Sequence, residues 1–241
     1  MVQLDENTSL REVLVQVPAA LRVLDAYRVD YACHGTQSLR AATAGLDVSG
    51  EELLRQIDDE ARATAGLELP SWSEAPLAFI AAHVIETHHA FARAELVRIL
   101  PLALEAEHGF RRAHPELSQV TALVEALCTE LMPHMCREER VLFPFIEELE
   151  RAEQEGRPPE PPRRGNPMSV LEHEHDHVRD VLAELRQVTS RYAAPRDGPP
   201  AYAELYGALE RLDRDLIHHM HLENNVLFPR ARALVAAAWP R

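Results

Sequence analysis

Two segments of this chain repeat one pattern of residues, and their first histidines stand 85 positions apart. The first segment runs from His134 to Pro144 and the second from His219 to Pro229, with seven of eleven positions identical. A lone His-x-x-x-Glu pair has little weight in a chain with 13 histidines, but two copies in matching frames have much more. A purely structural repeat, with Val-Leu-Phe-Pro as a buried helix end, is the alternative. We interpret the repeat as two helices with the same chemistry.

The spacing of four residues places the histidine and the glutamate of each copy on one helix face. Residues i and i+4 lie about 6 Å apart along the axis of an α-helix. An imidazole binds one metal ion, whereas a carboxylate has two oxygens and can bridge two ions. The two copies therefore predict a site for two metal ions in which Glu138 and Glu223 are the bridges.

Apolar residues at spacings of three and four predict four long helices in residues 76–241. The expected helices cover residues 76–108, 115–153, 168–192 and 201–237. Pro-rich stretches at 156–167 and 194–200 form two of the connections. Pro101 should kink the first helix or end it early, and Pro133 should bend the second. We predict an all-α fold built around an up-down-up-down four-helix bundle.

The first 66 residues differ in pattern from the rest of the chain. They are helix-rich but punctuated by Gly35, Gly45 and Gly50, and Pro18 stands where a helix could start. These breaks predict a small helical domain rather than a fifth long helix. We therefore divide the chain into an N-terminal domain at 1–66, a linker at 67–75 and the bundle at 76–241.

Composition and charge exclude several classes of protein. The formal net charge is −14, so the chain does not attract phosphate backbones and we expect no nucleic-acid partner. No apolar run reaches the roughly 18 residues of a membrane-spanning helix, so we expect no membrane partner. The N-terminus lacks the apolar stretch of a signal peptide. Three cysteines (Cys33, Cys128 and Cys136) are too sparse for a disulfide scaffold, which favours a reducing cytoplasm.

Each copy of the repeat has a histidine upstream at a similar distance. His89 precedes His134 by 45 positions, and His175 precedes His219 by 44. We predict that His89 and His134 bind one metal ion. His175 and His219 would bind the other ion, and the two glutamates would bridge both. The predicted metal ligands are His89, His134, Glu138, His175, His219 and Glu223.

Neighbouring histidines leave alternatives open on the first and third helices. The alternative ligands are His173 and His177 on the third helix, and His83 and His88 on the first. His108 lies about 28 Å beyond His89 along a straight helix, so it cannot share the same centre unless that helix breaks. Cys136 follows His134 by two positions and should point away from the ligand face.

The donor set favours a redox-active first-row metal. Structural zinc commonly takes thiolates in a tetrahedral site, and calcium and magnesium take oxygen ligands. Four imidazoles with two carboxylates suit iron or manganese. Two glutamates also supply a charge of only about −2 against +4 for two ferrous ions. The excess positive charge favours an oxo or hydroxo bridge, so we expect two bridged iron ions.

These motifs resemble the hemerythrin-like superfamily and, more closely, its di-iron proteins for repair of iron centres (RIC proteins). The run from His134 to Pro144 is similar to the family pattern His-Met-x-Lys/Arg-Glu-Glu-x-x-Leu-Phe-Pro, and the run from Leu222 to Ala231 is a highly specific match. The run Glu174-His175-Asp176 resembles the third-helix Glu-His-Asp of the family. The resemblance therefore implies His175 as the third-helix ligand, and it also implies His89 on the first helix.

The N-terminal segment is similar to the small ScdA-type domain that precedes the bundle in this family. Residues Asp30 to Gly35 resemble the usual Asp-Tyr-Cys-Cys-Gly-Gly. Ala32 replaces the first cysteine and His34 replaces a glycine, which puts vicinal-dithiol chemistry in doubt. Cys33 remains as an accessory thiol that could catch a metal together with His34, and a plain buried thiol is the alternative.

The resemblance implies a protein that repairs iron–sulfur clusters damaged by nitrosative or oxidative stress. Its partners would be damaged iron–sulfur proteins, with nitric oxide or dioxygen as small ligands, and the family also implies a homodimer. Iron supply and removal of nitric oxide are both compatible with the predicted centre. The alternatives are an enzyme that reduces nitric oxide or peroxide at the same centre, and an oxygen-binding or oxygen-sensing protein.

Overall fold

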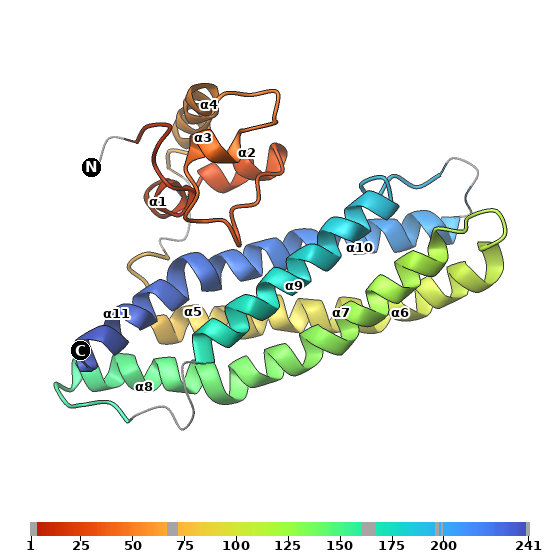
Figure 1. Cartoon of the computed structure of the whole chain (residues 1–241). Coiled ribbons are helices and arrows are strands. Elements are labelled where there is room, and N and C mark those ends of the chain that lie inside the picture. Colours follow the sequence, from red (N-terminus) through yellow and green to blue (C-terminus); the bar gives the residue numbers. More distant parts are fainter. Residues whose placement is uncertain (1–3, 67–71, 161–166, 196–197, 199, 240–241) are drawn as a thin grey trace.

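The described part of the chain is helical almost throughout. The structure, a computed structural model, describes residues 4–66, 72–160, 167–195, 198 and 200–239 (Figure 1). Within these ranges the only strand-like pairing is an isolated bridge between Ser9 and Ser38. No helix in them is long and apolar enough to cross a membrane. The predicted all-α fold is confirmed.

Four long helices run alternately up and down and form the bundle, as predicted (Figure 1). Three of them consist of two α-helices joined by a π-helical segment, whereas the third is a single α-helix. The first comprises α5 (Leu77–His83), η1 (Val84–His89) and α6 (Ala90–Phe110), and the second α7 (Leu117–Arg137), η2 (Glu138–Leu142) and α8 (Phe143–Gln154). The third is α9 (Pro167–Val188), and the fourth comprises α10 (Pro200–His221), η3 (Leu222–Leu227) and α11 (Phe228–Ala238).

Neither of the two internal prolines ends its helix. Pro101 lies inside α6 and Pro133 inside α7, so the first long helix does not stop early. Both prolines are on the exposed side of the bundle. Water can therefore bond the backbone carbonyls that each proline leaves without a donor. The change of helix type instead begins at Glu138, one of the predicted ligands.

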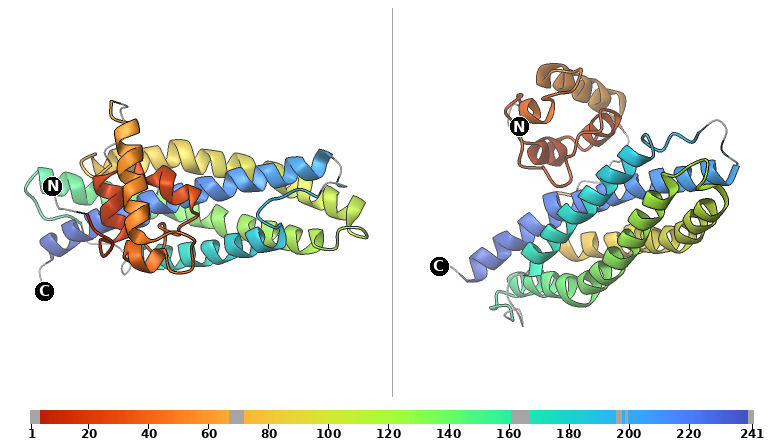
Figure 2. Two further views of the ribbon diagram at one scale, coloured as in Figure 1. Left: turned by 90° about the horizontal axis from the view of Figure 1, so that it is seen from above. Right: turned by 45° about the vertical axis from the view of Figure 1, so that its right-hand side comes forward.

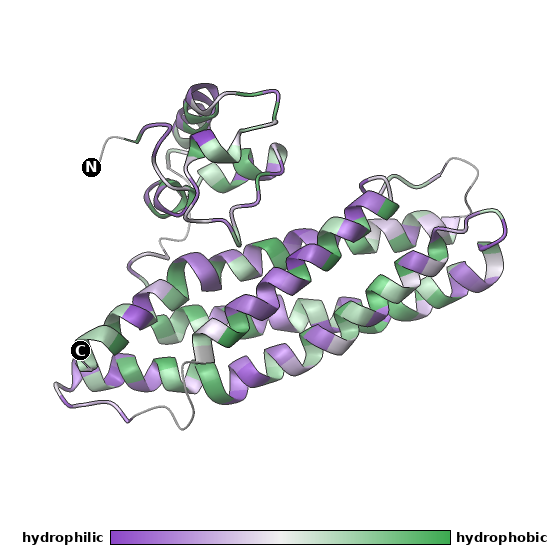
Figure 3. Cartoon of the chain, viewed as in Figure 1, coloured by the Kyte–Doolittle hydropathy of each residue, from purple (hydrophilic) through white to green (hydrophobic). Residues whose placement is uncertain are grey.

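The apolar interior of the bundle is divided along its length into two clusters. One includes Leu96 and Leu127, which follow His89 and precede Glu138 in the chain. The other surrounds Phe228 and collects the opposite ends of the same four helices. Hydrophobic and hydrophilic residues alternate along the long helices (Figure 3), and the apolar residues of the two clusters are the buried ones. The apolar interior is interrupted at the level of the predicted ligands, so a polar layer separates the two clusters.

The N-terminal residues form four helices, which lie on one side of the bundle (Figure 2). They are α1 (Leu10–Gln16), α2 (Ala20–Ala26), α3 (Leu39–Ala42) and α4 (Gly50–Ala63). Ser9 and Glu12 form a capping box at α1, and the Ser49 side chain caps α4. Their buried leucines, Leu10 and Leu24 among them, join the larger bundle cluster. The N-terminal helices therefore pack directly onto the bundle.

The linker predicted at residues 67–75 is only partly visible, because residues 67–71 lie outside the described residues. The part that follows is held against α11. One guanidinium nitrogen of Arg230 donates to the carbonyl of Trp72 at 3.0 Å and to that of Ala75 at 2.6 Å. The division into domains at 1–66 and 76–241 remains a prediction.

Gly35 lies where the N-terminal segment meets η3. A side chain at this position would place its Cβ 2.7 Å from Cγ of Asn225. Asn225 cannot turn away without cost, because its amide donates to the Tyr31 carbonyl at 2.8 Å and accepts from Arg11 at 3.2 Å. Glycine is therefore required at this contact because it has no Cβ.

We expect Gly35→Ala to destabilise the protein by about 1–3 kcal/mol, the usual cost of overpacking. Gly109→Ala is the matched control, because Gly109 lies in α6 and a Cβ there would meet no side chain or neighbouring segment within 4 Å. That change should be neutral or stabilise by up to about 1 kcal/mol. Urea unfolding followed by circular dichroism measures both. Equal stability of the two variants would contradict the tight contact.

Candidate metal centre

The six side chains predicted as ligands lie together in the polar layer of the bundle. Each has at most 1% of its surface exposed. All four long helices contribute to the set. The positions are His89 at the end of η1, His134 in α7, Glu138 at the start of η2, His175 in α9, His219 in α10 and Glu223 in η3.

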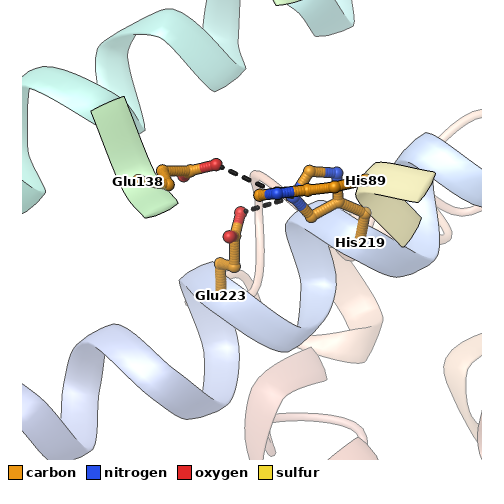
Figure 4. Close-up of side chains that lie close together, drawn as sticks. All are labelled: His89, Glu138, His219 and Glu223. Atoms are coloured by element: carbon orange, nitrogen blue, oxygen red, sulfur yellow. Dashed lines mark hydrogen bonds and ion pairs between the residues drawn. The ribbon is translucent and has the colours of Figure 1, made fainter. Parts of the chain in front are cut away.

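Their donor atoms form two overlapping groups, and in each group all atoms lie within 4.8 Å of one another. The first group is His89, Glu138, His219 and Glu223, and Figure 4 shows these four side chains pointing toward one another. The second group is His134, Glu138, His175 and Glu223. Glu138 and Glu223 belong to both groups, as a pair of bridging carboxylates would.

The predicted pairing of the histidines is wrong. The structure pairs His89 with His219, whose Nε2 atoms lie 3.2 Å apart. It pairs His134 with His175, whose Nε2 atoms lie 3.0 Å apart. Both pairings join helices that are neighbours in an up-down-up-down bundle, where the first helix touches the fourth as well as the second. Equal spacing along the sequence cannot distinguish these neighbours.

The carboxylate of Glu138 spans the two groups. Its Oε1 lies 3.1 Å from Nε2 of His134, and its Oε2 lies 3.3 Å from Nε2 of His89. Glu223 approaches from the fourth helix, with Oε2 at 3.1 Å from His219 and 3.2 Å from His175. One oxygen of Glu138 therefore faces each group.

The electrostatics of the layer call for added positive charge. Among the described residues, the four oxygens of Glu138 and Glu223 are buried without a hydrogen-bond partner. Burial and the neighbouring Glu223 raise the pKa of Glu138, but His134 and His89 outweigh both and lower it. Two ionised carboxylates buried this close need neighbouring positive charge or a shared proton. Two metal ions, one in each group, fit this requirement.

Protons on imidazoles supply positive charge when metal is absent. Burial lowers the pKa of His134, but the carboxylates of Glu138 and Glu223 outweigh it and raise the pKa to about 9. The pKa of His89 is also raised, by Glu138 and Glu223 acting against burial. A metal ion that enters must displace these protons.

Two of the imidazoles are held at Nδ1, the ring nitrogen that faces away from the centre, by carboxylates outside the centre. Nδ1 of His89 lies 2.8 Å from Oε1 of Glu139, which also accepts from Arg93 at 2.7 Å. Nδ1 of His134 lies 2.7 Å from Oε2 of Glu174. Such partners keep the proton on Nδ1 and direct Nε2 toward a metal.

An amide holds a third imidazole in the same way. Nδ1 of His175 lies 2.9 Å from Oδ1 of Asn224. The three outer partners share one feature, because each is the sequence neighbour of a ligand on an adjacent helix. Glu139 follows Glu138, Glu174 precedes His175, and Asn224 follows Glu223. These partners were not predicted, and their position beside a ligand is the signal that could have found them.

The alternative histidines, which are His83, His88, His173 and His177, are outside both groups, and so is His108, as expected. His173 and His108 are exposed, and His177 pairs at the surface with Glu130 at 2.7 Å. The π-helical segments were also not predicted. We find no pattern in the sequence that predicts them.

Cys33 lies beside the centre but outside both groups. Its Sγ is 3.9 Å from the carbonyl oxygen of His175 and 3.9 Å from the amide nitrogen of Asn224. Burial raises the pKa of the Cys33 thiol to about 12, and the carboxylates of Asp30 and Asp176 add to the effect. Cys33 is therefore a neutral thiol at physiological pH. All three cysteines are free.

We expect iodoacetamide to alkylate Cys33 far more slowly in the folded protein than in the unfolded chain. With a pKa of about 12, only about one thiol in ten thousand is ionised at pH 8. The rate should rise about tenfold for each pH unit, because the thiolate is the nucleophile. Mass spectrometry of the peptide that contains Cys33 measures the rate. A rate equal to that of the guanidinium-unfolded protein would contradict the raised pKa.

Comparison with known proteins places this geometry in a wider group. A family model described as "Hemerythrin HHE cation binding domain" matches residues 80–231, which include all six side chains. A relative from Pectobacterium atrosepticum named "Iron-sulfur cluster repair protein YtfE" is 31% identical over 93% of this chain and 96% of its own length. Proteins of the same name from Escherichia coli O157:H7 and Shigella boydii are 32% identical over the same shares.

Proposed function

This chain belongs to the hemerythrin HHE cation binding family and, within it, to the iron–sulfur cluster repair proteins, and from this membership we propose that it repairs iron–sulfur clusters damaged by nitrosative or oxidative stress. The observation that carries the proposal is the buried set of four imidazoles and two carboxylates. A relative with the repair name aligns over 93% of this chain.

The proposed cofactor is a pair of iron ions joined by an oxo or hydroxo bridge. The residues that would hold it are His89, His134, Glu138, His175, His219 and Glu223. Nitrogen-rich donor sets of this kind suit iron better than calcium or magnesium. When bound, the two irons would supply a redox change and a position for a small ligand such as nitric oxide or dioxygen.

The side chains around the centre would take part in both binding and losing metal. Without metal, burial lowers the pKa of His134, but the carboxylates of Glu138 and Glu223 outweigh burial and raise the pKa to about 9, so a proton would compete with a metal ion for this imidazole. Glu138, at 3.1 Å, and Glu174, at 2.7 Å, would accompany the ring in either state. Such competition is general for imidazole ligands, so it is compatible with iron supply and with removal of nitric oxide alike.

The proposed partners and location follow from the same chemistry. The partners would be iron–sulfur proteins whose clusters have lost iron or reacted with nitric oxide. A reducing cytoplasm suits the three free cysteines, and we retain it as the proposed location. A homodimer also remains a proposal.

We expect Glu138→Leu to lower the iron content well below two ions per chain. The change removes the carboxylate whose oxygens face both groups, while leucine keeps similar bulk. Glu147→Leu in α8 is the matched control, because Glu147 is exposed. Iron analysis and an absorption spectrum of the anaerobically reconstituted proteins measure the effect. Unchanged iron content and spectrum would remove Glu138 from the site.

The function itself is tested with a purified iron–sulfur dehydratase inactivated by nitric oxide. The iron-loaded protein and Glu147→Leu should restore its activity anaerobically, and Glu138→Leu should not. Failure of the loaded protein to restore activity would contradict repair. Sustained nitrous oxide production from added nitric oxide would instead favour a reductase. A stable, reversible dioxygen complex without repair would favour oxygen binding or sensing.

A further inference from the structure

A second group of histidines lines a cavity next to the metal centre. The cavity has a volume of about 300 Å³. Its wall includes His83 and His88 from the first long helix, and His218 and His221 from α10. Residues of α1 and α2, together with Trp72, close the other side. Four of the 13 histidines of the chain therefore gather at one cavity outside the proposed ligand set.

Carboxylates orient two of these imidazoles. Nδ1 of His88 lies 2.9 Å from Oδ1 of Asp215, which leaves Nε2 of His88 as the available donor. Nε2 of His218 lies 2.8 Å from Oδ2 of Asp25, which leaves Nδ1 of His218 available. Carboxylate–histidine pairs of this kind commonly orient imidazoles toward metal ions. The two aspartates also place negative charge beside the cavity.

The other two histidines differ in what they can offer. Nδ1 of His83 has only a long contact of 3.4 Å with the Thr87 hydroxyl, so its Nε2 is available. Nδ1 of His221 lies 3.1 Å from the amide nitrogen of Asn225, so it accepts and the proton sits on Nε2. His221 therefore only lines the cavity, while the other three histidines can act as ligands.

The cavity is one aromatic ring away from the metal centre. The ring of His88 stacks on that of His219, with centroids 5.8 Å apart and planes 9° apart. His83 also packs against His88, edge to face, with centroids 5.6 Å apart. An ion held in the cavity would therefore be separated from the proposed centre by little more than the His88 side chain.

We propose that this cavity is a loading site, where a divalent first-row transition ion binds loosely to His83, His88 and His218 before it enters the dinuclear centre. The proposal rests on the proposed function, since it needs that centre as the destination. Among the described residues, the nitrogen atoms of these three imidazoles do not form a group in which all donor atoms lie within 4.8 Å of one another. An ion must therefore draw them together, and such binding is weaker than in the preformed centre.

The cavity favours a cation over an anion or an apolar ligand. Arg22 is the one arginine among the described residues that line it, and its guanidinium pairs with Glu60 at 3.0 Å. The imidazoles offer neutral nitrogen donors, and the carboxylates of Asp25 and Asp215 stand behind them. Nitrogen donors with nearby negative charge select transition ions such as ferrous iron.

The test replaces His83 and His218 together, as His83→Gln with His218→Asn. Neither residue belongs to the proposed dinuclear centre. The control is His108→Gln with His173→Gln, which removes two exposed histidines elsewhere. Metal-free proteins are mixed anaerobically with ferrous iron, and the growth of the absorption of the centre is followed by stopped flow. The cavity variant should fill several-fold more slowly than the control and reach the same final iron content. Equal filling rates would overturn the proposal.

A measurement on the unaltered protein removes any dependence on how the variant folds. Crystals of the loaded protein are soaked in cobalt(II), and anomalous difference density locates the bound ions. A peak among His83, His88 and His218, in addition to the dinuclear centre, is expected. An occupied dinuclear centre without that peak would overturn the loading site alone. Lack of density at the dinuclear centre would instead overturn the proposed function.

Discussion

The structure depends on two carboxylates, Glu138 and Glu223, that are buried together with no hydrogen-bond partner in the described residues. Isolated charges are among the most costly groups to bury, so the interior around them must provide positive charge. Four imidazoles converge on them from all four long helices. Two of those imidazoles are held in turn by Glu139 and Glu174. The polar layer is therefore a charge-balanced unit that needs cations at its centre.

Three of the four long helices change from α to π geometry where they reach the layer. A π turn holds more residues than an α turn, so it shifts the face that the following residues present. The third helix, α9, stays regular through the layer and still buries His175 together with Leu171 and Val178. The π segments are therefore a feature of three helices and not a requirement for bringing ligands and apolar residues to one face.

Much of the fold and the set of converging side chains could be predicted from the sequence. The two copies of His-x-x-x-Glu and the histidines upstream are local patterns, and helix geometry relates such patterns directly to faces. The pairing of His89 with His219 could not be predicted in this way, because it depends on which helices are neighbours. The outer partners were not predicted either, although each stands next to a predicted ligand in the sequence. Glu139 binds an imidazole of another helix, so this signal identifies the residue but not the helix that it contacts.

The N-terminal helices are connected to the centre through two adjacent amides. Asn224 accepts from His175 and donates to the Ala32 carbonyl at 3.2 Å. Asn225 donates to the Tyr31 carbonyl at 2.8 Å. A short chain of hydrogen bonds thus links a proposed ligand to the backbone of the N-terminal segment. Asn224 therefore contributes both to the orientation of the His175 ring and to the position of that segment, which Asn225 also holds.

The division of the apolar interior has a further consequence for how the bundle can open. Helical proteins usually loosen first at their termini, where few apolar contacts restrain the chain. Here the two hydrophobic clusters clamp both ends, and the intervening level is held by charge balance instead. The packing of the helix ends therefore does not depend on the charge of the polar layer, and a change of charge there leaves the apolar contacts of both clusters in place.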